Sequence, residues 1–501
     1  MDFLKKYKSQ LLFHLYLNII FGIFITFASY YHLPVVSFTD SGFYFIHFIA
    51  LQFSLFGFLY FLSINKYVFK ILFPFLFLLL SSIAYWVYFQ DVTISQSVIQ
   101  ASLETKADIV IDLISIPLII YLLFSITTII LTLKYYNKLQ NNSLKSPLTI
   151  LAILAIYSYS FVENYRYGTF NRRLPYNVAV SVQEYFEQNP LTLKPITNDI
   201  KSNLDNLSVI FILGESVRAD HLQINGYTKK TTPLLASRND IISFPNTYTP
   251  LTYTAISVPQ ILTDATLTDD YSKPKYSLIQ VLNQAKIQTN WIGNQTPEKS
   301  YEIFINQSSF HQILDPFHSD LSFQKEYDEK LLPIFRKTFN PAINQFTTIH
   351  MIGSHWWYET RYPERFRIFK PVIKSKHTPS NSKEEMINSY DNTIVYLDYF
   401  INETIKEIEK TNSNTILIYL SDHGEILGEN NLWLHAQKNK ASENPALLIW
   451  CSAKFKKKYP NIISNLKSHQ NKKIHLDFFF PSIIDLYKID GIKYNKNKVI
   501  F

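Results

Sequence analysis

Residues 415–425 read TILIYLSDHGE, an apolar run that ends in a group of polar and acidic residues. Its first six side chains are β-branched, aliphatic or aromatic, which is typical of a buried strand. Asp422 and His423 follow directly, and both side chains belong to the types that bind divalent metal ions. The stretch therefore predicts a strand with candidate metal ligands at its carboxyl end.

Further apolar runs have the same pattern of a buried strand followed by polar residues. They cover residues 208–213, 288–292, 347–352 and 446–451. Segments with helical periodicity lie between them, the clearest at 383–410. Strands that alternate with helices predict a mostly parallel sheet covered by helices on both faces. In such sheets ligands bind beyond the carboxyl ends of the strands.

Three of these predicted strand ends carry further candidate ligands, and one histidine lies inside a strand. The set comprises Glu215, His350, His355, Asp422 and His423, with His435 a short loop later. Taken singly, each residue has an ordinary explanation as a helix cap, a turn residue or a surface histidine. Together, at three successive strand ends, they favour a site for zinc or a similar divalent ion.

A hydroxyl-rich loop supplies candidate nucleophiles. Residues 248–260 read YTPLTYTAISVPQ and lead into a predicted helix. Coordination to a metal ion lowers the pKa of a hydroxyl and makes it a nucleophile, and a helix start offers N–H groups to a phosphoryl oxygen. Thr252, Thr254 and Ser257 all qualify, and the residues alone do not choose among them.

The first third of the chain is strongly apolar. Five stretches of about the 20 residues needed to cross a bilayer cover residues 9–31, 43–64, 68–89, 113–133 and 147–162. The first is too long for a signal peptide and has no small-residue cleavage site, so we interpret it as an anchor. Residues 1–163 are thus predicted to form a transmembrane domain of five helices.

The distribution of lysines predicts the orientation of these spans. Lysines precede the first span and fill the loops between the second and third and between the fourth and fifth, whereas the opposite loops carry only Lys106. This bias predicts a cytoplasmic N-terminus and, with five spans, a periplasmic catalytic domain at 206–501. Residues 94–112 are expected to form a helix on the membrane surface, and 164–205 a linker.

Composition sets broader limits. A chain of 501 residues is too long for one ordinary domain. The net charge of +8 suits an anionic membrane surface or phosphate-bearing substrates, and lysine-rich codon usage explains it equally well. Cys451 is the single cysteine, so no intramolecular disulfide forms. We expect membrane lipids, and no nucleic acid, among the partners.

Four motifs occur in a fixed order after the five spans: GESVRADHLQINGY at 214–227, TYTAISVP at 252–259, HMIGSH at 350–355 and SDHGEILGE at 421–429. In this order they resemble the phosphoethanolamine transferases, membrane-anchored enzymes of the alkaline-phosphatase/sulfatase-like superfamily. The resemblance covers essentially the whole chain and favours the cysteine-poor branch of the family. It implies an alkaline-phosphatase-like fold for the α/β domain.

The resemblance also implies roles for individual residues. Thr254 is the implied nucleophile, and Glu215, Thr254, Asp422 and His423 are the implied ligands of one tightly bound Zn2+. It places six further residues near the transferred phosphate, at a second, weaker zinc or at the headgroup: His355, His435, His350, Lys299, Asn294 and Gln295.

The implied reaction is a zinc-dependent transfer of phosphoethanolamine at the bacterial inner membrane. The donor is phosphatidylethanolamine, the intermediate is covalent at Thr254, and the acceptor is lipopolysaccharide, at lipid A or a core sugar. Pro250 and Gln260 stand where relatives that modify lipid A have cysteines, which leaves the acceptor open. The alternatives are a phosphoglycerol transferase, a membrane-bound phosphodiesterase or hydrolase, and an inactive scaffold.

Overall fold

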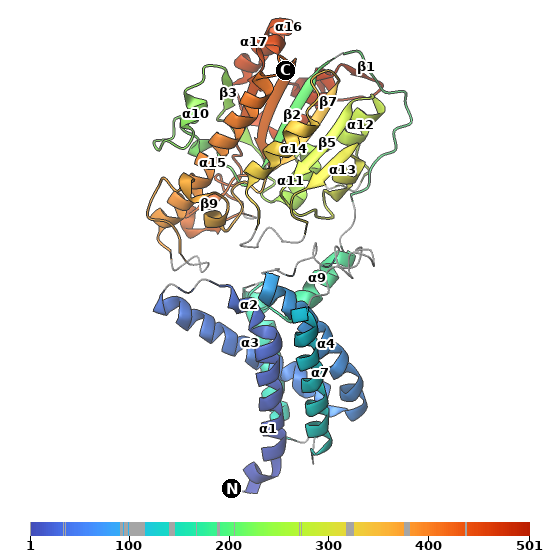
Figure 1. Cartoon of the computed structure of the whole chain (residues 1–501), viewed down its shortest axis with the longest axis vertical. Coiled ribbons are helices and arrows are strands. Elements are labelled where there is room, and N and C mark those ends of the chain that lie inside the picture. Colours follow the sequence, from blue (N-terminus) through green and yellow to red (C-terminus); the bar gives the residue numbers. More distant parts are fainter. Residues whose placement is uncertain are drawn as a thin grey trace. The chain divides into compact units, whose positions relative to one another are not determined.

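The computed structural model divides the chain into two compact units (Figure 1). One comprises Met1–Glu187 with Lys374–Ser380, and the other comprises Gln188–Ile373 with Asn381–Phe501. The structure describes residues 2–33, 35, 37–90, 94, 99, 116–139, 146–166, 168–187, 191–204, 206–269, 271, 273–316, 325–374, 381–435 and 438–501.

The first unit is a bundle of helices long and apolar enough to cross a membrane. The spans cover Tyr7–Thr26, Phe38–Ile64, Lys66–Phe89, Ile116–Asn137 and Leu148–Tyr165. The helices are α1 (Asp2–Phe21), continued by η1 (Gly22–Thr26) and α2 (Ala28–Tyr31), then α3 (Phe38–Ile64), α4 (Lys66–Gln90), α7 (Ile116–Asn137) and α8 (Leu148–Tyr165). The prediction of five spans is confirmed, and the chain is a multi-pass membrane protein with a separate α/β domain.

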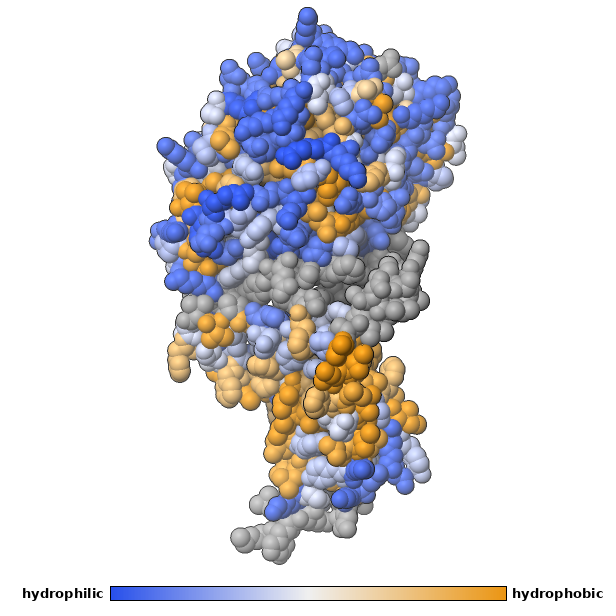
Figure 2. All heavy atoms as spheres, viewed as in Figure 1, coloured by the Kyte–Doolittle hydropathy of each residue, from blue (hydrophilic) through white to orange (hydrophobic). Residues whose placement is uncertain are grey.

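The face of this bundle seen in Figure 2 is mostly apolar, with hydrophilic residues toward its lower end. Large hydrophobic side chains such as Ile71, Phe124 and Ile150 point outward, as lipid-facing residues do. Inside the bundle, Gly57 lets α3 approach α8 closely, since a methyl group on Gly57 would lie 2.7 Å from the carbonyl oxygen of Ala152. The surface helix predicted at 94–112 lies outside the described residues, apart from Ile94 and Ile99. After α8 the unit ends with α9 (Tyr176–Glu187).

The second unit contains a seven-stranded sheet in the order β3-β11-β8-β2-β7-β5-β6. The strands are β2 (Ser208–Gly214), β3 (Ile241–Phe244), β5 (Gln288–Gly293), β6 (Phe310–Ile313), β7 (Gln345–His350), β8 (Thr415–Ser421) and β11 (Leu447–Cys451). Strands β8, β2, β7, β5 and β6 are parallel, and β11 runs antiparallel to both of its neighbours. The prediction of a mostly parallel sheet is confirmed.

Helices cover both faces of this sheet. Successive side chains of a strand point to opposite faces, so those of β2 pack in two different cores. Phe211 packs in a core with α12 (Leu278–Gln284) and α18 (Phe479–Leu486). Ile210 and Ile212 pack in the other, with α14 (Leu331–Thr338) and α15 (Lys383–Glu409). Helix α15 matches the helix predicted at 383–410, and a capping box at Ser382 fixes its start.

Candidate active site

The central strands bring the predicted ligands to one edge of the sheet. Strands β8, β2 and β7 are adjacent and parallel, so their carboxyl ends lie together. Gly214, the last residue of β2, pairs with Ser421, the last residue of β8. Glu215 and Asp422 are therefore the first residues beyond two neighbouring strand ends, where ligands collect in sheets of this type.

Glu215, Thr254, Asp422 and His423 form one contiguous cluster. The Thr254 hydroxyl donates a hydrogen bond of 2.8 Å to Oε2 of Glu215. Nε2 of His423 lies 3.4 Å from the other oxygen of Glu215 and 3.3 Å from Oδ2 of Asp422. Glu215, Asp422 and His423 are buried, and Thr254 is partly exposed. A reactant would therefore reach the cluster from the side of the hydroxyl.

Two atoms of this cluster have the properties of metal ligands. Nδ1 of His423 donates to the carbonyl of Gly424 at 2.8 Å, which leaves the lone pair of Nε2 facing the carboxylates. Oδ1 of Asp422 accepts the backbone N–H groups of Ser216 and His423. Nε2 of His423 and Oδ2 of Asp422 are buried without a hydrogen-bond partner. Such converging, unpaired atoms fit a bound cation.

Electrostatics supports the same interpretation. Burial raises the pKa of Asp422 well above its usual range, and the Glu215 carboxylate raises it further. Burial also raises the pKa of Glu215, but His423, His355 and His435 lower it by more, so the net shift is downward. Burial lowers the pKa of His423. A divalent cation would offset the cost of burying both carboxylates in ionised form.

His355 and His435 stand next to this cluster. The ring of His435 lies 4.8 Å from the ring of His423 and 6.0 Å from that of His355, between centroids. A ligand atom of His435 lies within 4.8 Å of ligand atoms of Glu215 and His423, so these three residues could also hold a metal ion. The structure thus brings both predicted histidines to the site.

Glu425 orients His435, and we did not predict this role. Its buried carboxylate accepts a hydrogen bond of 3.0 Å from Nδ1 of His435 and one of 2.5 Å from the hydroxyl of Tyr358. Glu425 stands in the SDHGE motif, so its position was a signal. Tyr358 comes from a 3-10 turn (Tyr358–Thr360) that carries no recognisable pattern.

The geometry distinguishes the three candidate nucleophiles. Thr254 is the first residue of α11 (Thr254–Ile261), and its hydroxyl contacts the cluster. Ser257 lies one turn later and is fully buried, and its hydroxyl has no hydrogen-bond partner within the described chain. Thr252 precedes the helix and is buried as well. Of these three hydroxyls, the Thr254 hydroxyl is the one that donates to Glu215.

The residues predicted to bind the headgroup are placed differently from one another. Gln295 is in the cluster, because its amide donates to Oε2 of Glu215 at 3.1 Å and to the carbonyl of Met351 at 3.0 Å. Asn294 is fully buried, and its amide donates to the Glu326 carbonyl and to Oδ1 of Asp328. Both N–H groups of Asn294 are thus used within the protein, whereas its Oδ1 has no partner among the described residues, and its contact with a headgroup stays a prediction.

His350 and Lys299 lie outside the cluster of carboxylates. His350 is the last residue of β7, and its buried ring packs edge-on against Trp291 and Tyr301, with centroid distances of 5.5 and 5.3 Å. Lys299 lies in the loop after β5 and is partly exposed. Its contact with a phosphate stays a prediction.

Asp328 holds the loop that follows β7 in place. Its buried carboxylate accepts the backbone N–H groups of Ile352 and Gly353 at 2.9 and 3.0 Å. Gly353 has φ +52°, and a Cβ there would lie 3.0 Å from both the backbone nitrogen and the backbone oxygen of Glu215. The loop can therefore pass this close to Glu215 only with glycine at 353.

Tyr390 of α15 fixes the segment after Glu215. Its buried hydroxyl donates to the carbonyl of Ser216 at 2.7 Å and accepts the N–H of Arg218 at 2.9 Å. Ser216 has φ +60°, which is costly for a residue with a side chain. The tyrosine thus stabilises a strained turn that aims Glu215 at Thr254. The sequence predicts the helix at 383–410 but gives no role for Tyr390.

Comparisons with known proteins agree with this geometry. Residues 208–489 match the model of the Sulfatase family, and residues 52–188 match the model described as Phosphoethanolamine transferase EptA/EptB. Phosphoethanolamine transferase EptA of Helicobacter pylori is 30% identical over 455 residues, which are 84% of each chain.

Solved structures are similar over one unit or over nearly the whole chain. The soluble domain of lipooligosaccharide phosphoethanolamine transferase A from Neisseria meningitidis is 26% identical, covers 62% of this chain and 98% of its own, and gives a TM-score of 0.57. The integral membrane form of that protein covers 98% of both chains with a TM-score of 0.59 at 22% identity, and so shows a common fold.

The α/β domain is that of a sulfatase-like enzyme, with its candidate site at the carboxyl edge of the central strands. It is joined to a bundle of five apolar helices, the arrangement of the full-length structure to which the chain is similar. The chain belongs to the phosphoethanolamine transferase family and is an enzyme that transfers phosphoethanolamine.

Replacing Gly353 by alanine should lower the transfer rate and the thermal stability together. The new methyl group meets the backbone of Glu215, and the left-handed backbone costs about 1–3 kcal/mol with a side chain present. Gly226→Ala is the matched control, because Gly226 has φ +95° but open space around it. The control should lose stability and keep its kcat. Equal kcat values for both variants, measured on purified full-length protein, would contradict the role of Gly353.

Proposed function

We propose that this enzyme transfers phosphoethanolamine from phosphatidylethanolamine to a lipopolysaccharide acceptor, with Thr254 as the nucleophile at a zinc site. The observation that carries the proposal is the 2.8 Å hydrogen bond from the Thr254 hydroxyl to Glu215, beside the buried Asp422 and His423. Membership of the family supplies the transferred group. The side chains supply a hydroxyl and a place for a cation.

Zinc would be held by Glu215, Thr254, Asp422 and His423. Two carboxylates, an imidazole and a hydroxyl are ligands that zinc accepts, and the unpaired Oδ2 of Asp422 and Nε2 of His423 favour this set. When bound, zinc would lower the pKa of the hydroxyl and balance negative charge on the phosphoryl oxygens. His435 and His355 could help to hold a second ion.

The side chains of the enzyme account for the remaining steps. Thr254 attacks the phosphorus of the donor, and the bond to the diacylglycerol oxygen breaks, which leaves phosphoethanolamine esterified to Thr254. The acceptor oxygen then attacks the same phosphorus and releases the threonine oxygen. In the first step Thr254 loses its hydroxyl proton and the leaving diacylglycerol oxygen gains one; in the second the acceptor hydroxyl loses a proton and the released threonine oxygen regains one. We assign these transfers to His355 and His435, the second of which Glu425 orients.

Donor and acceptor follow from chemistry and from similarity. Phosphatidylethanolamine carries the transferred group as a phosphodiester and resides in the membrane that the five helices would cross. The lipopolysaccharide acceptor is supported by the similar soluble domain, which belongs to a lipooligosaccharide phosphoethanolamine transferase.

The lysines before the first span and in alternate loops favour a cytoplasmic N-terminus, and thus an inner-membrane enzyme with residues 206–501 in the periplasm. Lys299 and Gln295 remain our candidates for headgroup contacts.

Thr254→Ala should abolish transfer, because no other hydroxyl replaces the nucleophile. Thr254→Ser should keep part of the activity, and Thr252→Ala should keep nearly all of it. Incubation with phosphatidylethanolamine should add the mass of one phosphoethanolamine group to a peptide that contains Thr254, detectable by mass spectrometry in the wild type and absent in Thr254→Ala. Full activity of Thr254→Ala would rule out this nucleophile.

Removal of metal should abolish transfer, and added zinc should restore it. His423→Ala and Asp422→Ala should lower the zinc content of the purified protein and weaken zinc affinity by about 10–100-fold or more. His469→Ala, which changes a partly exposed histidine at the end of α17 (Pro460–His469), should bind zinc as the wild type does. Elemental analysis together with a zinc titration provides the measurement. Unchanged zinc content in both site variants would overturn the ligand assignment.

Headgroup and acceptor can be tested separately. Vesicles with labelled phosphatidylethanolamine should give labelled lipopolysaccharide, and vesicles with labelled phosphatidylglycerol should not. Label transferred from phosphatidylglycerol would favour a phosphoglycerol transferase, and free phosphoethanolamine without modified glycolipid would favour a hydrolase. Mass analysis of lipopolysaccharide from cells with and without the gene would show whether lipid A or a core sugar carries the group.

A further inference from the structure

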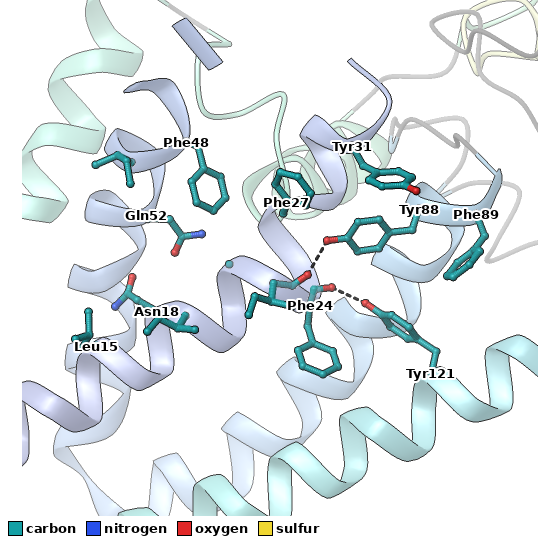
Figure 3. Close-up of a pocket in the computed structure, with 14 residues that line it drawn as sticks. Leu15, Asn18, Phe24, Phe27, Tyr31, Phe48, Gln52, Tyr88, Phe89 and Tyr121 are labelled. Carbon is teal, nitrogen blue, oxygen red and sulfur yellow. Dashed lines mark hydrogen bonds between the residues drawn. The ribbon is translucent and has the colours of Figure 1, made fainter. Parts of the chain in front are cut away.

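A large apolar groove lies within the membrane-spanning unit, along the first span (Figure 3). Its volume is about 870 Å³, in the range of roughly 300–1,000 Å³ that is usual for small-molecule sites. Residues of the first span line its floor, and side chains of α3, α4 and α7 form its walls. The residues used below are Leu15, Asn18, Gly22, Ile23, Tyr31 and Gln52.

The floor of the groove is a turn of π-helix. The N–H of Phe27 donates to the carbonyl of Gly22, five residues earlier, at 2.9 Å. The carbonyl of Ile23 therefore loses the N–H that a regular α-helix would give it. Tyr88 of α4 donates to this carbonyl at 2.6 Å instead, and Tyr121 of α7 donates to the carbonyl of Phe24 at 2.7 Å (Figure 3). The two tyrosines hold the irregular turn open, so the groove is formed in advance.

The groove faces the lipid rather than the interior of the bundle. Leu15 of α1, Ile23 of η1 and Tyr31 of α2 are 55%, 63% and 58% exposed. From Leu15 to Tyr31 the segment rises at most about 24 Å, taking about 1.5 Å per residue for a regular helix. One leaflet of the hydrocarbon core is about 15 Å deep, half of about 30 Å. The groove is therefore long enough for an acyl chain together with its linkage to glycerol.

One polar side chain distinguishes this groove from ordinary contact with bilayer hydrocarbon. Both Nε2 and Oε1 of Gln52 are inaccessible and have no hydrogen-bond partner in the described chain. The amide packs over Gly22, where a Cβ would lie 3.3 Å from Nε2. Oδ1 of Asn18, a second lining residue, is also unpaired. An unpaired amide is costly in hydrocarbon, and by turning toward the groove it can donate its N–H to the ester carbonyl of an acylglycerol.

We propose that this groove binds the phospholipid donor, with one acyl chain along the first span and its ester carbonyl at Gln52. The inference rests on the proposed function, in which phosphatidylethanolamine is the donor. Because the groove opens sideways to the bilayer, the lipid enters it from the leaflet without leaving the membrane. The preformed shape reduces the cost of ordering the chain.

Photolabelling tests occupancy without relying on transfer. The full-length protein is placed in phosphatidylcholine vesicles that contain phosphatidylethanolamine with a diazirine on one acyl chain, and the labelled peptides are mapped. Label should concentrate on the first span and on the α3 peptide that contains Gln52. Ile23→Trp fills the groove and should reduce this label several-fold. Ile150→Trp is the matched control, since Ile150 on α8 is 66% exposed and lies outside the groove.

Kinetics in detergent micelles tests the contribution to catalysis. Ile23→Trp should raise the KM for long-chain phosphatidylethanolamine roughly tenfold. This is the low end of the effect that one extra or missing methylene group has in an apolar pocket. Its KM for the dihexanoyl lipid should stay unchanged, because that chain is too short to fill the groove. Gln52→Leu should raise the KM for the long-chain donor, and Ile150→Trp should change neither value.

The outcomes separate the groove from the proposed function. Equal losses with short-chain and long-chain donors would show an effect on folding and overturn the groove. Equal labelling by a phosphatidylglycerol probe, together with an unchanged KM in Ile23→Trp, would show ordinary bilayer contact and also overturn it. A wild-type KM in Gln52→Leu would overturn the ester contact. A third outcome is that Ile23→Trp loses the label although the wild-type protein transfers nothing from phosphatidylethanolamine. The groove would then be a phospholipid site, and phosphatidylethanolamine would not be the donor.

Discussion

The burial of two carboxylates side by side is the constraint around which the α/β domain is organised. Glu215 and Asp422 follow adjacent parallel strands, so the register of the sheet forces them together away from water. Uncompensated, such a pair would be strongly destabilising. Backbone N–H groups, the Ser216 hydroxyl and the Gln295 amide satisfy part of the demand. Oδ2 of Asp422 has no hydrogen-bond partner and lies 3.3 Å from Nε2 of His423. The two atoms are therefore placed as ligands of a cation.

Residues far from the reacting atoms serve this same constraint. Asp328 holds the loop at Gly353 against Glu215, and Tyr390 holds the strained turn at Ser216. The Tyr390 hydroxyl contacts backbone atoms, and Asp328 accepts two backbone N–H groups besides the amide of Asn294, so both residues fix the path of the chain. The positions of the site atoms depend on these contacts, because a hydrogen bond between Thr254 and Glu215 tolerates errors of only a few tenths of an ångström.

Much of the fold could be predicted from the sequence, because it depends on local patterns. Apolar runs of bilayer length and strand-helix alternation do not require knowledge of distant contacts. The same reasoning missed β3 and β6, which have four residues each, and β6 is mostly exposed. The antiparallel direction of β11 could not be predicted either, since periodicity carries no information on direction.

The site was predictable as a group and less so residue by residue. Strand ends identified Glu215, Asp422 and His423, since the edge of a parallel sheet collects them. Spacing could not choose Thr254 over Ser257, because that choice depends on where α11 begins and which of its faces is buried. Asn294 donates to Asp328, and the ring of His350 packs against Trp291 and Tyr301, so the structure shows their surroundings while their roles stay predictions. Such contacts are a tertiary property, and a motif does not encode them.

The membrane unit meets a related problem with different chemistry. An irregular turn in hydrocarbon exposes carbonyl groups that water cannot satisfy. Two tyrosine hydroxyls satisfy them, whereas the α/β domain uses backbone N–H groups around its carboxylates. Both units also contain several buried polar atoms that have no hydrogen-bond partner among the described residues, so a single unpaired atom says little about function. Convergence is more informative: Oδ2 of Asp422 and Nε2 of His423 are both unpaired and lie 3.3 Å apart. In the membrane unit, the unpaired amide of Gln52 and Oδ1 of Asn18 line the same groove. In each unit it is the meeting of unpaired atoms at one place that points to a ligand.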